Sequence, residues 1–198
     1  NYFIGIVSAK QDYTSLAFKH LNKIQYLKDN HMNFKIEFIR TLILLEKFDE
    51  AFDFSEKAWT EDELFFESDL LLGINSFINE DYKNAKKYFE RLNNVSRHNM
   101  LFSQFINNIL LSWVEASQNN KQNSFDYFDK IPERYRNLKK IQNSFLQCYF
   151  DTSKTQIAFE QLMNDEDSDF SRYDFFFVNY LLFKNKDIEA EKVITLSR

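Results

Sequence analysis

The sequence predicts an all-α fold, because its composition disfavours strands and its residues recur with the period of a helix pair. Only two Gly and one Pro occur in 198 residues, against 23 Phe. Strands joined by tight turns need Gly, Pro and Asn-Gly pairs, whereas helices joined by short polar turns tolerate this composition. Hydrophobic residues make up 44% of the chain, which is enough to bury a substantial core.

The repeat is clearest at three small residues spaced 34 apart, which are Ala17, Ala51 and Ala85. Three further columns keep step with them. Four residues later stand Leu21, Ser55 and Phe89; seven later stand Ile24, Ala58 and Leu92; twelve earlier stand Gly5, Ile39 and Gly73. Columns that stay in register across three units indicate a structural repeat.

The period continues after one slip of five residues. Ser124 stands 39 residues after Ala85, Ala158 stands 34 after Ser124, and Ala190 stands 32 after Ala158. We expect the connection 96–101 to absorb the slip, because it falls between helices. The six expected units span 1–29, 30–60, 61–97, 98–132, 133–166 and 167–198.

Each unit is expected to hold two helices joined by a polar turn. Asp or Asn at the start of the second helix is expected to cap its free N–H groups. The run Thr60-Glu61-Asp62-Glu63 is typical of a capping box that opens the third unit. No intervening stretch is long enough for a linker, so we expect one domain, 1–198. The expected helices are 2–10, 13–27, 32–46, 49–58, 61–79, 82–94, 99–118, 122–131, 135–150, 153–163, 170–184 and 187–197.

These columns resemble the tetratricopeptide repeat (TPR) family, whose 34-residue unit has small and large residues at set positions. The third unit carries the resemblance best, through Leu72, Gly73, Tyr82, Ala85 and Phe89. The second unit matches at Phe48 and Ala51, and the fifth at Ala158 and Leu162. The resemblance covers nearly the whole chain.

The resemblance implies a right-handed superhelix (an α-solenoid) of about six units. Small residues let the two helices of a unit approach closely, and neighbouring units stack because one unit cannot bury its own apolar face. It also implies a non-catalytic scaffold that binds a partner protein. Abundant Asn, Lys, Ile and Phe indicate an AT-rich genome, and the chain is similar to long bacterial repeat proteins, so we expect a fragment of a longer array.

The charge balance argues against nucleic-acid and membrane partners. The formal net charge is −5 and no basic stripe is present, whereas phosphate neutralisation supplies most of the affinity of nucleic-acid binders. The longest apolar stretches, such as 175–183, are too short to span a bilayer. We therefore expect a soluble protein without membrane insertion, in the cytoplasm or the periplasm.

No catalytic, metal or cofactor site is expected. The histidines at 20, 31 and 98 lack the spacing of a zinc site. Cys148, the only cysteine, is expected to be a buried and inert thiol. The acidic run 165–169 begins like a calcium loop, but Phe170 stands where the sharp turn needs Gly, so we expect a solvated turn. Gly5 and Gly73 are expected to be close-packing positions, since neither has the companions of a phosphate loop.

A partner peptide or helix is expected in the concave groove, which the first helix of each unit lines in this family. The family's clamp for C-terminal carboxylates is not reproduced, since only Asn179 falls at a matching position. An aromatic anchor with a few cations suits an extended peptide or an amphipathic helix. The expected groove residues are Arg40, Ile74, Trp113, Lys140, Asn143, Gln147, Arg172 and Asn179.

The last expected helix leaves an apolar edge formed by Ile188, Val193, Ile194 and Leu196. Terminal repeats normally need a polar cap, so we expect the array to continue or this edge to meet another chain. Two alternatives to the protein-binding scaffold stay open. One is an RNA-binding helical repeat; the other is a non-catalytic array attached to a functional region outside these residues.

Overall fold

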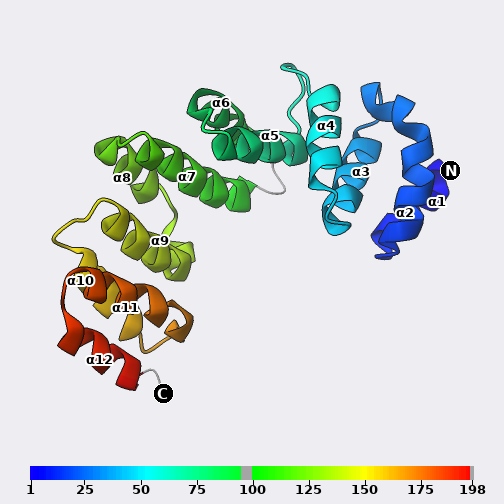
Figure 1. The fold of residues 1–198 in the computed structure, drawn as a ribbon. Helices are drawn as coiled ribbons and strands as arrows, with labels where there is room; N and C mark the ends of the chain where they lie inside the picture. The colour runs from blue at the N-terminus through cyan, green and yellow to red at the C-terminus, as the bar shows by residue number, and fades with distance from the viewer. Residues whose placement is uncertain (95–99, 197–198) are drawn as a thin grey trace. The chain divides into compact units, whose positions relative to one another are not determined.

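The structure, a computed structural model, describes residues 1–94 and 100–196, and every regular element in these ranges is helical (Figure 1). Twelve α-helices and four short 3₁₀ segments follow one another along the described chain. The first half holds α1 (Tyr2–Lys10), α2 (Thr14–Leu21), η1 (Asn22–Asp29), α3 (Met32–Leu44), α4 (Phe48–Ala58), α5 (Phe66–Ile78), α6 (Tyr82–Arg91) and η2 (Leu92–Asn94). The second half holds α7 (Met100–Ser117), α8 (Lys121–Asp129), η3 (Glu133–Tyr135), α9 (Arg136–Tyr149), α10 (Thr155–Met163), η4 (Ser171–Tyr173), α11 (Asp174–Phe183) and α12 (Asp187–Leu196).

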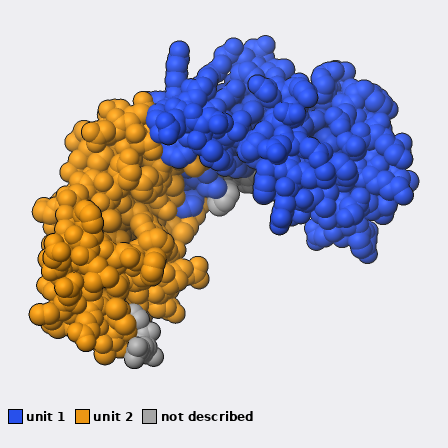
Figure 2. All heavy atoms as spheres, viewed as in Figure 1, with its two compact units in different colours: residues 1–107 blue, residues 108–198 orange. Residues whose placement is uncertain are grey.

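The chain divides into two compact units, residues 1–107 and 108–198, which Figure 2 colours separately. The boundary falls within α7. Inside each unit, the most extensive contacts join helices that follow one another, such as α1 with α2, α5 with α6, and α11 with α12. The all-α prediction is confirmed for the described residues, and the right-handed superhelix stays a prediction.

Every helix pair closes through the same backbone turn. Among the described residues, the non-glycine positions with positive φ are Asp12, Glu46, Glu80, Asn119, Asp151 and Asn185, with φ between 45° and 61°. Each is the first residue past the C-cap of an odd-numbered helix, where chains often adopt the left-handed conformation. The spacings of the first three are 34 residues, as the sequence repeat requires.

Two hydrogen bonds recur at each of these turns. The left-handed residue donates its N–H to the carbonyl three residues before it, at 2.8–3.3 Å. The next residue donates to the carbonyl five residues before it, at 2.8–3.0 Å. This pair of bonds is the Schellman motif, which satisfies carbonyls that a helix end would otherwise leave unpaired. The polar turns are therefore confirmed, but their acidic residues end one helix and do not cap the next, with the exception of Asp81, which accepts a bond from the Asn84 N–H at 3.1 Å.

The fifth turn explains a two-residue irregularity in the sequence period. The other turns begin the next helix two residues after the left-handed residue, whereas α10 begins at Thr155, four residues after Asp151. Thr155 is buried, and its hydroxyl donates to the carbonyl of Gln147 at 2.7 Å. The predicted slip at 96–101 falls largely on residues outside those described.

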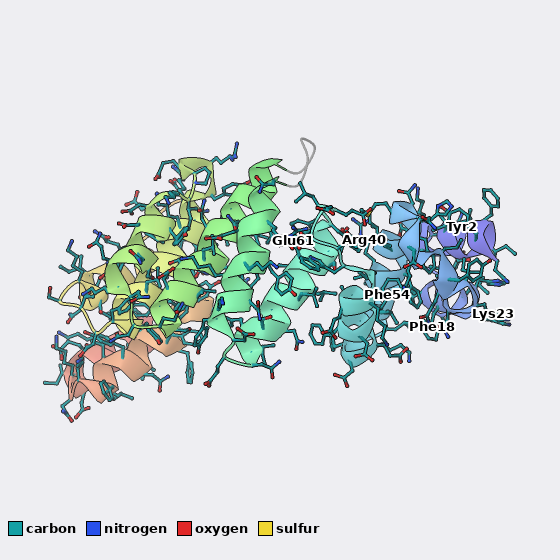
Figure 3. All side chains as sticks on the ribbon, turned by 90° about the horizontal axis from the view of Figure 1, so that it is seen from above. Tyr2, Phe18, Lys23, Arg40, Phe54 and Glu61 are labelled. Atoms are coloured by element: carbon teal, nitrogen blue, oxygen red, sulfur yellow. The ribbon has the colours of Figure 1, made fainter. Side chains whose placement is uncertain are left out.

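The predicted small-residue column lies in the core. Its members Ala17, Ala51, Ala85, Ser124, Ala158 and Ala190 are all buried. In the first unit, aromatic rings fill the space around this column: the Phe18 and Phe38 centroids lie 6.3 Å apart and those of Phe38 and Phe54 lie 4.8 Å apart (Figure 3). Local spacing in the sequence thus specifies which helix face is buried.

Both glycines are close-packing positions, as predicted. A Cβ at Gly5 would stand 2.5 Å from Leu21 Cδ2, and a Cβ at Gly73 would collide with the Phe89 ring. The two contacts are equivalent in the repeat, since both partners move by 68 residues. Each glycine therefore lets a first helix approach the second helix of its own pair.

The capping box predicted at residues 60–63 is wrong. The segment 59–65 is a loop, and α5 begins only at Phe66. The Arg91 guanidinium accounts for the loop, because it donates to the carbonyls of Thr60, Glu61 and Glu63 at 3.2, 2.7 and 2.7 Å. Those carbonyls would accept from helical N–H groups if the helix began at residue 61. Likewise, the predicted helices 13–27 and 170–184 each contain a 3₁₀ segment, η1 and η4.

Candidate functional site

The eight predicted groove residues are all at least partly accessible. In unit 1, the exposed Arg40 of α3 donates to Glu67 at 2.8 Å, and Ile74 of α5 is half-buried (Figure 3 labels Arg40). Arg40 also lines a cavity of about 580 Å³ with Glu37 and Leu44. In unit 1, then, the predicted cation is already paired with an acid.

In unit 2, three predicted residues are joined through direct contacts. The Trp113 indole N–H donates to Gln142 Oε1 at 2.8 Å, and its ring meets Tyr149 edge-on with centroids 5.7 Å apart. The Gln147 amide donates to Asn143 Oδ1 at 3.2 Å. Trp113, Asn143 and Gln147 thus hold fixed orientations on α7 and α9.

The predicted cations of unit 2 have different surroundings. Lys140 forms an ion pair with Asp165 and holds the pKa of that carboxyl below its usual value. Together with Asn143 it lines a cavity of about 520 Å³. Arg172 is exposed in η4. Asn179 donates its amide N–H to the Phe175 carbonyl at 2.6 Å.

An aromatic cleft lies between α9 and α11, the first helices of the last two pairs. It encloses about 540 Å³. Of the predicted residues, only Asn179 lines it. The aromatic lining consists of Phe145, Tyr149, Phe159, Phe176, Tyr180 and Phe183, and we call this surface the aromatic cleft.

The walls of the aromatic cleft are held by ring-to-ring contacts. The Phe145 and Phe176 centroids lie 5.0 Å apart with an interplanar angle of 86°, and Phe145 meets Phe159 edge-on at 6.2 Å. Edge-to-face pairs of this kind add about 0.5–1.5 kcal/mol beyond the area they bury. The rim is left open, since Phe183 is 78% and Tyr149 53% exposed. A rigid wall with an exposed aromatic rim can accept an apolar side chain without rearranging.

Cys148 lines the aromatic cleft, and the expectation that it is fully buried is wrong. It is half-buried because the cleft opens beside it. Partial burial and the nearby Asp151 carboxylate raise the pKa of its thiol, so it is protonated at neutral pH. Lys184 pairs with Asp151 at 2.6 Å, and this contact raises the lysine pKa.

The rings that form the aromatic cleft were missed because groove positions were counted at fixed offsets from each small residue. The cleft lies between two helices, so it uses flanking positions such as Phe145, Tyr149 and Phe176. One signal was present: α11 is apolar all round apart from Asn179 and its first residue. A helix of that kind cannot bury every side in a thin array, so part of it must face a partner or solvent.

The acidic run forms a turn held by α9, as well as by its own backbone. Arg136 pairs with Asp167 at 3.1 Å, and Asn137 donates to the Ser168 hydroxyl at 2.7 Å. The Asp169 carboxylate accepts from the Ser171 N–H at 2.9 Å, and this bond lowers its pKa. Across residues 1–94 and 100–196, no three His, Cys, Asp or Glu side chains are grouped so that they could share a metal ion. Of the two histidines in those ranges, His20 contacts Asn1 and His31 lies against Tyr2.

The apolar edge predicted on the last helix is present in α12. Ile188, Ile194 and Leu196 are exposed, and Val193 is half-buried. A search of the described helices for a segment long and apolar enough to cross a membrane finds none. The chain matches no protein-family model, no curated protein and no solved structure.

Proposed function

We propose that this chain is a non-catalytic interaction module of the TPR type, in which a partner peptide or helix inserts an apolar side chain into the aromatic cleft. The observation that carries the proposal is the cleft itself, a cavity of about 540 Å³ with aromatic walls and an exposed aromatic rim. Binding energy at protein interfaces concentrates where aromatic or aliphatic anchors enter such pockets.

The polar groups near the aromatic cleft suit a peptide backbone. Asn179 lines the cleft, and the Asn143–Gln147 pair lies on α9. Side-chain amides both donate and accept, so they can satisfy the N–H and C=O groups of an extended or helical partner. Trp113 extends the aromatic surface through its contact with Tyr149. A partner with two apolar residues about one helical turn apart would match this arrangement.

The TPR assignment and the right-handed superhelix are part of the proposal. They are supported by the 34-residue spacing of the first three left-handed turns and by the burial of the small-residue column. The close approach at Gly5 and Gly73 is the packing that a TPR unit requires. In such an array the first helices line the concave side, so a cleft between α9 and α11 would open into the groove.

Selection from a random peptide library against the whole chain tests the proposal. We expect enriched peptides to carry large apolar residues, and their Kd to rise at least about tenfold in Phe183→Ala. Phe3→Ala is the matched control, because Phe3 is also an exposed ring (81%) but lies on α1. Its Kd should equal that of the wild type.

Cys148 supplies an independent readout, since it is the only thiol and lines the aromatic cleft. A bound peptide should slow its alkylation by a small reagent. Peptides that bind without protecting Cys148, or that bind Phe183→Ala and wild type equally, would overturn the cleft assignment. A mixed RNA oligomer in the same assay tests the alternative: binding that weakens with salt would favour an RNA-binding repeat.

A further inference from the structure

A second cavity lies on a different side of α11 from the aromatic cleft. It has a volume of about 620 Å³ and lies between α10 and α12, with η4 and α11 as its floor. Asp174, Phe177 and Leu181 of α11 line it, whereas Phe176, Tyr180 and Phe183 line the aromatic cleft. Each set recurs at intervals of three or four residues, so each occupies its own face of the helix.

The floor and the rim of this second cavity differ in character. Met163, Phe177 and Val193 contribute apolar side chains. The charged lining residues are almost all acidic: Glu160, Asp165, Asp169, Asp174 and Glu189 against the single cation Lys192. We call this surface the acidic groove.

Neighbouring groups leave most of this negative charge in place. Lys140, which pairs with Asp165, neutralises one of the five carboxylates. Glu160 accepts from the neutral Gln156 amide at 2.8 Å, and Asp169 accepts from the Ser171 backbone N–H at 2.9 Å. Hydrogen bonds from neutral donors stabilise a carboxylate without removing its charge. The acidic groove is thus more negative than an even spread of the chain's net charge of −5 would make it.

We infer that the acidic groove is a binding site for a basic amphipathic helix of a partner protein. Two parallel requirements lead to this occupant. The apolar floor needs an apolar stripe, and the carboxylate rim needs lysine or arginine beside that stripe. A helix lying along α10 and α12 presents both at once, because its apolar residues recur every three or four positions and its cations flank them. This site is separate from the aromatic cleft, so one chain could hold two partner segments.

The test uses the whole chain and an 18-residue Leu/Lys peptide with helical apolar spacing. We expect saturable binding at low salt, weakened as NaCl is raised, and no binding of the Leu/Glu counterpart. Glu189→Lys combined with Glu160→Lys should raise the Kd about tenfold or more, because two attractions become repulsions. Glu191→Lys is the matched control: Glu191 lies on the same helix and is exposed, but does not line the groove.

The outcomes separate this inference from the proposed function. Phe183→Ala should leave Leu/Lys binding unchanged, and the bound peptide should not slow alkylation of Cys148. Equal weakening by Glu191→Lys and by Glu189→Lys would show general charge attraction and overturn the site. So would loss of Leu/Lys binding in Phe183→Ala, since the peptide would then occupy the aromatic cleft. Circular dichroism of each variant checks that the helices are retained.

Discussion

Asp69 in unit 1 is the most constrained side chain among the described residues. Its carboxylate is fully buried, and Oδ1 accepts from Trp59 Nε1 at 2.7 Å and from Arg91 Nε at 2.9 Å. The other oxygen, Oδ2, has no hydrogen-bond partner. Arg91 also lies over the Trp59 ring and holds the loop carbonyls described above. One guanidinium therefore fixes both the start of α5 and the ring beside it.

Replacing Arg91 should be severe. Arg91→Met would leave a buried carboxylate without its charge partner and release the 59–65 loop, so we expect a loss of about 3–5 kcal/mol in the free energy of unfolding. Arg40→Met is the control, because the Arg40–Glu67 pair is largely exposed and should contribute about 0–1 kcal/mol. Urea denaturation of both variants measures the difference. Similar losses in the two would show that the Asp69 cluster is not a structural lock.

The Asp69 cluster should also give a pH dependence of stability. Desolvation raises the pKa of Asp69 above its ordinary value, outweighing the hydrogen bonds from Trp59 and Arg91. The folded state then binds the proton more tightly than the unfolded state, so stability falls as pH rises from the ordinary carboxyl pKa through the raised one. Subtracting the pH profile of Asp69→Asn isolates this group. A wild-type stability that rises relative to Asp69→Asn over that window would contradict the assignment.

Among the helix-joining turns, those at Glu46 and Glu80 are the least favourable. Both residues adopt left-handed φ near 60°, a conformation that costs most L-residues about 1–2 kcal/mol. Asp and Asn, which occupy the other four turns, tolerate it better. The sequence could not reveal this geometry, because Gly, its usual signal, is absent from every one of the six positions.

Glycine should therefore stabilise these turns. We expect Glu46→Gly and Glu80→Gly each to raise the free energy of unfolding by about 0.5–1 kcal/mol, since relief of strain exceeds the entropy that glycine gains in the unfolded chain. Glu56→Gly, on an exposed position inside α4, should instead lower it by about 1 kcal/mol. Thermal melts of the three variants give the comparison. A uniform loss would show that the turns carry no relievable strain.

The close helix approach at Gly73 yields the opposite prediction for a helical glycine. Ala normally favours a helix by about 1 kcal/mol, but at Gly73 its Cβ would collide with the buried Phe89 ring. We expect Gly73→Ala to lower the free energy of unfolding by about 1–3 kcal/mol. Adding Phe89→Leu should recover part of that loss. If the two losses are additive in urea titrations, the contact does not set the helix separation.

The sequence predicted most of the helices and the buried columns, because both depend on local spacing. The 59–65 loop was not predictable, since it is fixed by Arg91, a residue about 30 positions away in the chain. The aromatic cleft was missed for a related reason. It combines flanking positions of α9 and α11, and the packing of two helices, not the period of one, decides which rings remain exposed.

At the scale of the whole molecule, each compact unit holds one of the two tryptophans, Trp59 in unit 1 and Trp113 in unit 2. Contacts within the units are mostly between consecutive helices, so stability should be transmitted weakly over distance. We expect Gly73→Ala to lower the urea midpoint reported by Trp59 more than that reported by Trp113. Variants with one tryptophan replaced by Phe separate the signals. Coincident midpoints in both would mean that the units unfold as one.

The turns that close each helix pair onto its predecessor also bear on how the chain is made. A 34-residue segment leaves the ribosome in about 2–7 s at 5–20 residues per second. A helix pair joined by a short turn has only nearby contacts to form and can do so in microseconds to milliseconds. Each pair therefore has time to fold before the next one emerges. We expect synthesis to build this protein one pair at a time, with little unfolded chain exposed at any moment.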